Sequence, residues 1–238
     1  TLAVTGVYLL QFTTSDPESA RDSIVYLITR VDYGNFVRSV HFWAANLMVV
    51  TMMLHMLRIF VTGSYKRPRE GQWLIGVLML VIISLTYFAG TVIKWDQEAY
   101  EAFLHFQEMM TGILGSTANI FSTEQWGTTT VLARVYRMHT IILPAAFVLL
   151  LIPHLLLIKR QHLSPITRRD QTEDPPQDDT VQTTFLMHQR HLIGYGMLFV
   201  AVIALLAVAF PAQIGGQVIL GLEVTLPPWF FWWEHALA

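Results

Sequence analysis

The chain contains no cysteine among its 238 residues, and it has few charged side chains. Without cysteine it can form no disulfide, no iron–sulfur cluster and no covalent bond to a c-type haem within these residues. Charged residues make up 13% of the sequence, against roughly 25% in soluble domains. The net charge of −2 gives no indication of nucleic-acid binding. The N-terminus also lacks the basic region that begins a secretory signal.

Long apolar stretches are what the sequence has in abundance. Four of them reach the length of about 20 residues that a helix needs to cross a hydrocarbon core of about 30 Å; they cover approximately residues 36–61, 73–93, 131–158 and 192–210. Residues 1–12 predict the end of a further helix, so we expect the natural chain to begin upstream, and the final PPWFFWWEHALA predicts a loop and the start of a sixth membrane helix. Because an isolated strand cannot satisfy its backbone in lipid, the sequence predicts an all-α integral membrane protein.

The connections between these stretches differ in charge. Basic residues follow the stretches 36–61 and 131–158. Acidic residues occur in the other two loops: around position 22, before the stretch 36–61, and from Asp96 to Glu124, after the stretch 73–93. The positive-inside rule predicts that the basic loops face the negative (n) side of the membrane and the acidic loops the positive (p) side. We expect residues 96–130 to form short amphipathic helices on the p-face. Residues 164–190 predict a solvated n-side linker between segments 1–163 and 191–238.

Four of the nine histidines lie inside predicted membrane helices, in two pairs. His41 and His55 are 14 residues apart, and His139 and His154 are 15 residues apart. Either spacing returns approximately to one face of a helix and separates the side chains by about 21–23 Å. Because one crossing separates the two helices, they run in the same direction. His41 is then level with His139 and His55 with His154.

Histidines at membrane depth are costly and are usually functional. Each level offers two imidazoles that could bind one iron from opposite sides, so the pattern predicts two bis-histidine b-type haems that carry electrons across the bilayer. Glycines and basic residues support these levels: we expect Gly6, Gly76 and Gly90 to pack against the haems, and Arg38, Arg134, Lys159 and Arg160 to neutralise haem propionates. Close helix packing and snorkelling to headgroups are the alternative explanations.

In this arrangement the chain resembles the cytochrome b/b6 family. The resemblance extends from about Gly6 to Ser164 and includes RSVHFWAANLMVVTMMLHMLRIFVTGSYKRPRE, the WDQ of residues 95–97 and RVYRMHTIILP. The 15-residue spacing resembles the b6 branch. Residues 192–231 resemble the start of the partner subunit of that branch, and PPWFF lies where the family has its PEWY quinol-site motif.

The resemblance implies a subunit of a quinol–cytochrome c, or plastocyanin-type, oxidoreductase that works by a Q-cycle. Quinol would be oxidised in a p-side pocket lined by Phe88, Trp95, Pro227, Pro228, Trp229 and Phe230. Electrons would pass to a Rieske iron–sulfur protein with its c-type cytochrome, and through the two haems to quinone near the n-face. The implied assembly is homodimeric and lies in the bacterial cytoplasmic membrane or an equivalent energy-transducing membrane. A further subunit could carry the remaining C-terminal helices, and a third haem could attach upstream.

Two positions depart from the family pattern. Pro228 replaces the PEWY glutamate, which accepts a proton in the family, so we expect Glu223, or secondarily Asp96, to take that role. Lys94 replaces the proline before the tryptophan. Two other functions compete with this interpretation: a dihaem b-type anchor of a hydrogenase or dehydrogenase, which would need no Rieske partner, and a haem-free transporter whose histidines relay protons.

Overall fold

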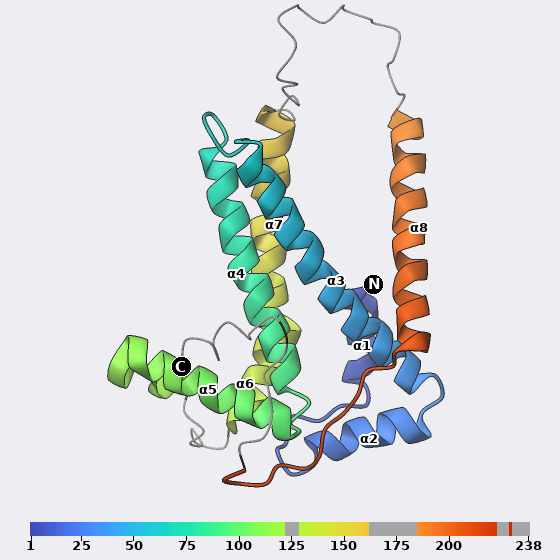
Figure 1. The fold of residues 1–238 in the computed structure, drawn as a ribbon, viewed down its shortest axis with the longest axis vertical. Coiled ribbons are helices and arrows are strands. Elements are labelled where there is room, and N and C mark those ends of the chain that lie inside the picture. The colour runs from blue at the N-terminus through green and yellow to red at the C-terminus, as the bar shows by residue number, and fades with distance from the viewer. Residues whose placement is uncertain (122–128, 162–184, 223–228, 230–238) are drawn as a thin grey trace, which may run out of the picture.

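The computed structural model describes residues 1–121, 129–161, 185–222 and 229. All regular elements within these residues are helical (Figure 1). In chain order they are α1 (Leu2–Leu10), α2 (Ala20–Arg30), α3 (Gly34–Val61), α4 (Glu70–Val92), α5 (Gln97–Leu114), the 3₁₀ helix η1 (Gly115–Phe121), α6 (Val131–Arg137), the π-helix η2 (Met138–Ile142), α7 (Leu143–Gln161) and α8 (Phe185–Ala209).

Three helices are long and apolar enough to cross a membrane. They are α3, α4 and the continuous run of α6, η2 and α7, whose apolar span is Val131–Arg160. The apolar part of α8, Ile193–Ala209, is a shorter helix of the same character. These elements confirm the predicted all-α membrane fold, and their ends lie within a few residues of the predicted ones except at α8, which begins at Phe185.

The membrane helices form a bundle in which α4 packs against α3 and α7, while α1 and α8 pack against α3. Figure 1 shows that α3 and α7 run in the same direction and that α4 runs in the opposite direction. This is the arrangement that the histidine pairs require. The chain leaves both α3 and α7 at the upper end of Figure 1, which is the predicted n-side.

Two helices lie across the lower end of the bundle, the predicted p-side (Figure 1). The sequence predicts an acidic loop around residue 22, whereas the structure forms α2, which buries Ala20, Ile24 and Leu27 on one face. Residues 97–114 form one 18-residue amphipathic helix, α5, where several short helices were expected. Asp96 begins α5 by accepting a hydrogen bond from the Ala99 N–H through Oδ1.

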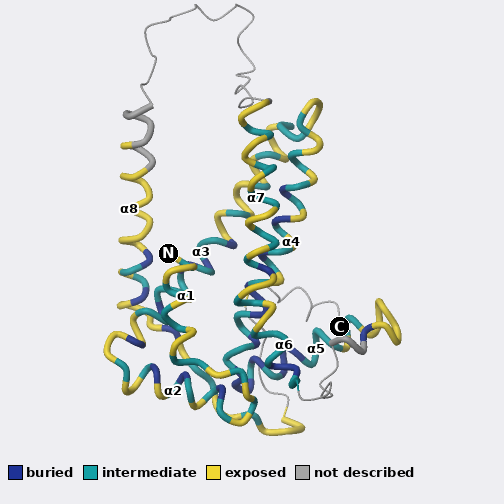
Figure 2. The backbone as a smooth tube through the Cα atoms, turned by 180° about the vertical axis from the view of Figure 1, so that it is seen from behind, coloured by how far each residue is buried: buried dark blue, intermediate teal, exposed yellow. Residues whose placement is uncertain are grey.

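Burial differs along the bundle. The core cluster gathers at the p-side end, where Val92, Phe103 and Leu132 are at most 2% exposed. Figure 2 shows long exposed stretches along α7 and α8. These carry apolar side chains such as Leu149 and Leu205, which are 69% and 67% exposed. Apolar surface of this extent in a bundle of membrane-length helices indicates contact with lipid tails.

The segment that follows α8, residues 210–222, runs beneath the bundle and is held by side chains from three earlier elements (Figure 1). On α3, Trp43 Nε1 donates to the Phe210 carbonyl at 2.7 Å, and Ser39 Oγ accepts from the Ala212 N–H at 3.0 Å. On α2, Arg21 Nε donates to the Gly215 carbonyl at 2.9 Å. We call residues 210–222 the p-side strap.

The WDQ motif holds the other half of the p-side strap. Asp96 Oδ2 accepts from the Gly215 N–H at 2.7 Å. Gln97 Oε1 accepts from the Ile219 N–H at 2.6 Å, and its Nε2 donates to the Leu222 carbonyl at 2.8 Å. The aspartate and the glutamine of this motif therefore fasten the chain beyond α8 to the junction between α4 and α5.

Candidate functional site

The p-side histidine pair comes together between α3 and η2. The ring centroids of His41 and His139 are 6.2 Å apart, and the ring planes meet at 69°. The Nδ1 atom of His139 lies 2.9 Å from the Thr86 carbonyl oxygen of α4. The Nδ1 atom of His41 lies 2.8 Å from Thr5 Oγ1 of α1. Each ring is thus fixed by a group from a third helix.

These contacts determine which ring nitrogen is protonated. A carbonyl can only accept, so the Nδ1 of His139 carries the proton and donates it to Thr86. The hydroxyl of Thr5 lies 3.1 Å from the carbonyls of Thr1 and Leu2, to which it can donate. It can then accept from the Nδ1–H of His41. Both rings keep a free lone pair on Nε2, the tautomer of a metal-ligating histidine whose other nitrogen has a hydrogen-bond partner.

Glycines make room for these rings. A Cβ on Gly90 would lie 2.7 Å from Cε1 of His139, which is too close unless the ring shifts, and 3.1 Å from its Nδ1, which is a tight contact. A Cβ on Gly6 would lie 3.5 Å from Cε1 of His41, which is an ordinary contact. The glycines predicted to pack on a macrocycle therefore also face the imidazoles, and Gly90 is the position where a side chain would force the ring to shift.

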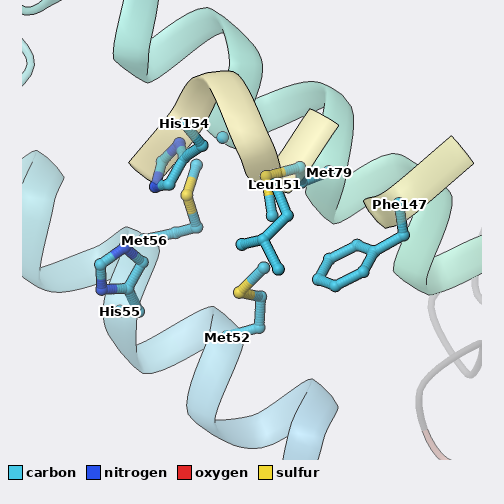
Figure 3. A pocket seen from close by; sticks show the side chains of 8 residues that line it. Met52, His55, Met56, Met79, Phe147, Leu151 and His154 are labelled. Carbon is cyan, nitrogen blue, oxygen red and sulfur yellow. The ribbon is translucent and has the colours of Figure 1, made fainter. Parts of the chain in front are cut away.

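The n-side histidines line a cavity of about 200 Å³ (Figure 3). His55 of α3 and His154 of α7 lie on opposite sides of it, and Gly76 of α4 contributes to its wall. The remaining lining residues are apolar: Met52, Met56, Met79, Phe147 and Leu151. A cavity with two imidazoles in apolar surroundings suits a flat apolar cofactor whose metal needs axial nitrogen ligands.

The ring of His154 resembles that of His139 in its surroundings. Its Nδ1 atom is buried without a hydrogen-bond partner among the described residues. The Gln72 carbonyl of α4 lies nearby, outside hydrogen-bond geometry. A Cβ on Gly76 would lie 3.6 Å from Cε1 of this ring.

Helix α4 thus presents the same pair of groups twice. Gly76 follows Gln72 by four residues, just as Gly90 follows Thr86, and the two pairs are 14 residues apart. This is also the spacing of His41 and His55 on α3. Because 14 residues return a helix to within about 40° of its starting direction, α4 offers a carbonyl and a glycine to a histidine at two depths.

The 15-residue spacing between His139 and His154 has a structural explanation that is visible only in the backbone. In a regular α-helix 15 residues would leave two side chains about 60° apart, turned the other way from a 14-residue pair. His139 lies in the π-helix η2, which interrupts the α-helix at Met138–Ile142. A π-turn takes up one extra residue. The spacing of 15 therefore acts as a spacing of 14.

The predicted basic residues lie near helix ends. Lys159 and Arg160 are in the last turn of α7, and Arg134 is in α6. Arg38 of α3 has partners that the sequence did not indicate: Nη1 and Nη2 donate to the carbonyls of Ala212 and Gln213 at 2.6 and 2.7 Å. Its guanidinium therefore holds the p-side strap, and its predicted role toward a propionate stays a prediction.

Two of the predicted quinol-pocket residues, Phe88 and Trp95, lie at the p-side end of α4. Phe88 and Trp95 are 7% and 8% exposed and belong to the core cluster. Trp95 has a positive φ of 47°, an uncommon and strained conformation for a bulky residue. It makes the corner between α4 and α5. Trp229 donates from Nε1 to Asn46 Oδ1 of α3 at 2.7 Å. Pro227, Pro228, Phe230 and Glu223 lie outside the described residues.

Asp96, the second candidate proton acceptor, is completely buried. Its Oδ1 caps α5, and its Oδ2 contacts the Gly215 N–H at 2.7 Å and Lys94 Nζ at 3.2 Å. Lys94 also forms an ion pair with Glu98. Both carboxylate oxygens thus have structural partners, and the lysine that replaces the family's proline supplies one of them.

A family model described as Cytochrome b(N-terminal)/b6/petB matches residues 46–217. The chain belongs to the cytochrome b/b6 family. A menaquinol:cytochrome c reductase cytochrome b subunit of Geobacillus thermodenitrificans is 36% identical to it over 166 residues, which cover 68% of this chain and 74% of the relative. A cytochrome b6 of Heliobacterium mobile is also 36% identical over 166 residues, which cover 68% of this chain and 77% of that relative.

A solved structure of a hyperthermophilic respiratory Complex III has the same fold. It matches 99% of this chain and 68% of its own chain with a TM-score of 0.80, at 19% sequence identity. Family membership confirms the predicted resemblance, the location in an energy-transducing membrane and the function in electron transport linked to quinol oxidation. It also gives the cytochrome a haem b cofactor and a place in a bc-type complex with other subunits.

Proposed function

We propose that this cytochrome holds two b-type haems and transfers electrons across the membrane in a Q-cycle, from quinol at the p-side to quinone at the n-side. The observation that supports this most directly is the pairing of imidazoles at two depths. His41 lies opposite His139, and His55 lies across a cavity from His154. The 14-residue spacing of His41 and His55 separates the two levels by about 21 Å along α3.

The donor set suits haem better than a bare metal ion. Each level supplies two imidazoles, and the described residues contain no group of three or more His, Asp or Glu side chains that could hold an ion. His41 with His139, and His55 with His154, would each hold one haem, and the bound haems would supply one-electron carriers.

The protein's own part is to fix the ligands and keep water away. The Thr86 carbonyl and the Thr5 hydroxyl hold the p-side rings with Nε2 free. The glycines of α4 and α1 leave flat surfaces beside the rings, and the methionines of the n-side cavity provide an apolar, adaptable wall. Rigid ligands in apolar surroundings are what electron transfer requires, because little must rearrange when the charge changes.

Quinol oxidation belongs at the p-side end of α4, beside the His41–His139 pair. Phe88, Trp95 and Trp229 would form walls of the pocket, together with Pro227, Pro228 and Phe230. One electron would leave through a Rieske iron–sulfur protein and a c-type cytochrome, and the other through the histidine pairs to quinone. The complex would be a homodimer, with the remaining helices carried by a further subunit. The division of the chain at residues 163 and 190 likewise stays a prediction.

The carboxylate that accepts the quinol proton is Glu223 in this proposal. Asp96 has both carboxylate oxygens occupied by structural partners, which favours Glu223 over it. In a Glu223→Gln variant we expect slower quinol oxidation and an altered pH profile, with unchanged haem content. An unchanged rate and profile would dismiss Glu223.

A redox titration of the purified complex, with identification of its subunits, tests the function. We expect two b-type components with separate midpoint potentials, a co-purifying Rieske protein, and quinol–cytochrome c reductase activity. Two b haems without a Rieske partner would indicate the dihaem anchor of a dehydrogenase or hydrogenase instead. A reduced-minus-oxidised spectrum without a b-type α-band would indicate a haem-free transporter.

A further inference from the structure

A buried asparagine in the middle of α3 joins three distant parts of the chain. Asn46 is 7% exposed, and its Oδ1 accepts from the Tyr87 hydroxyl of α4 at 2.9 Å and from Trp229 Nε1 at 2.7 Å. Its Nδ2 donates to the Phe42 carbonyl one turn earlier at 2.9 Å. Because an indole N–H can only donate, the orientation of the amide is determined. We call Asn46, Tyr87 and Trp229 the asparagine triad.

The asparagine triad lies next to the p-side histidine pair. Asn46 follows His41 by five residues, and Tyr87 precedes Gly90 by three. These offsets correspond to about 5–8 Å along the helix axes, toward the membrane interior. Trp229 is the tryptophan of the PPWFF motif. The triad is thus the described contact between this motif and the helices that hold the candidate haem ligands.

Both acceptor sites of the amide oxygen are directed to this contact. Asn46 Oδ1 has two lone pairs and receives two donors, and the amide also donates to its own helix. An apolar residue at this position would leave the Tyr87 hydroxyl and the indole N–H without this acceptor. Leaving buried donors unsatisfied costs more than an average hydrogen bond contributes. The indole is therefore held at one place and in one orientation.

We propose that Asn46 is a positioning residue for the quinol pocket: together with Tyr87 it holds the Trp229 indole in place, so that this ring can serve as a wall against which quinol binds. This inference rests on the proposed function of the pocket. Trp229 is 42% exposed even though its N–H is bonded to a buried atom. Much of the ring is thus left uncovered by the described chain, as expected of a pocket wall that contacts a flat substrate.

The test uses the complex purified from its membranes, with Asn46→Leu, Asn46→Asp and Trp229→Phe variants. Ultraviolet resonance Raman spectroscopy reports hydrogen bonding at indole N–H, and the band lost in Trp229→Phe identifies the contribution of Trp229 among all tryptophans of the complex. We expect Asn46→Leu to shift that band to a weaker hydrogen bond. It should also raise the KM for quinol about tenfold with little change in kcat.

Three controls make the result specific. Asn46→Asp keeps the acceptor, so it should restore the Raman band and most of the affinity for quinol. Thr51→Val, which removes an exposed hydroxyl bonded only within α3, should change neither. The double variant Asn46→Leu with Trp229→Phe should raise KM no further than the single variants do, because both substitutions remove the same hydrogen bond between Asn46 and Trp229.

An unshifted Trp229 band in Asn46→Leu, an unchanged KM in Trp229→Phe, or additive effects in the double variant would each overturn the proposal. Trp229→Phe alters no residue of the helix bundle, so it decides the matter even if Asn46→Leu fails to assemble. Failure of the proposed function looks different: the wild-type complex would then lack b haem or quinol oxidation, while the Raman shift could still be present.

Discussion

The imidazole of His139 lies 2.9 Å from the backbone carbonyl of Thr86, a group that helix α4 can offer only because Gly90, one turn later, has no side chain. The orientation of the His139 ring therefore depends on how closely α4 packs against η2.

Gly90→Ala should remove or displace the p-side haem. The added Cβ would lie 2.7 Å from His139 Cε1, and the ring cannot move away without losing the Thr86 carbonyl. We expect the b-haem content of the purified complex to fall toward half, measured from the reduced-minus-oxidised spectrum. Gly76→Ala, with a Cβ at 3.6 Å from His154, should be milder, and Gly71→Ala, with open space around it, should have no effect. Equal haem content in all three variants would contradict the fit described for Gly90.

Thr5→Val should raise the midpoint potential of the p-side haem. A hydrogen bond from Nδ1–H makes an imidazole a better electron donor, which favours the oxidised iron. Losing a bond of about 1 kcal/mol corresponds to a rise on the order of 40 mV for one electron. A redox titration should show this rise in one component only. Thr5→Ser keeps the hydroxyl and should titrate as the wild type does.

Asp96→Ala should destabilise the complex through the p-side strap. The substitution removes the cap of α5 and leaves the Gly215 N–H without its acceptor, at a combined cost of about 2–4 kcal/mol. We expect the haem spectrum to be lost at a lower temperature while the pH profile of quinol oxidation keeps its shape. Glu108→Ala, whose side chain is 81% exposed on α5 and has no contact with the p-side strap among the described interactions, is the matched control. A changed pH profile would return Asp96 to the role of proton acceptor.

Deleting Thr140 from η2 should be tolerated. Removal of one residue from a π-turn leaves an α-turn, so His139 and His154 would keep their relative directions at a spacing of 14. Deleting Val50 from the regular helix α3 would instead rotate His55 by about 100° relative to His41. We expect two haems in the first variant and at most one in the second, counted by redox titration.

Much of the bundle could be predicted because lipid restricts the options. A helix of about 20 apolar residues is the only regular way for this chain to cross a bilayer, so the ends of α3 and α4 follow from hydropathy within a few residues. The histidine levels follow from helical periodicity. Amphipathic helix α2 was missed, although Asp22 in its first turn and the apolar pair Ile24 and Leu27 were available as signals.

The contacts that hold the p-side together could not be predicted. Gln97 and Arg38 bind backbone groups of residues 212–222. Every residue has a backbone carbonyl, and nearly every residue has an N–H, so the residue types in the sequence do not indicate which of these groups is the partner. Asn46 was not singled out because a lone amide in a membrane helix has several uses, and its partners lie 41 and 183 residues away. The π-helix has one weak signal in the sequence, the spacing of 15 between His139 and His154 against 14 between His41 and His55. Only the backbone shows that a π-turn takes up the extra residue.

The π-helix also affects how relatives should be aligned and compared. A gap between chains with ligand spacings of 14 and 15 belongs inside residues 138–142, because only there does the extra residue leave the flanking helix in phase. The number of residues between two histidines on one helix is then an imperfect measure of the distance between the two levels of the membrane at which they lie. Two lineages could differ by one codon and still conduct electrons over the same gap.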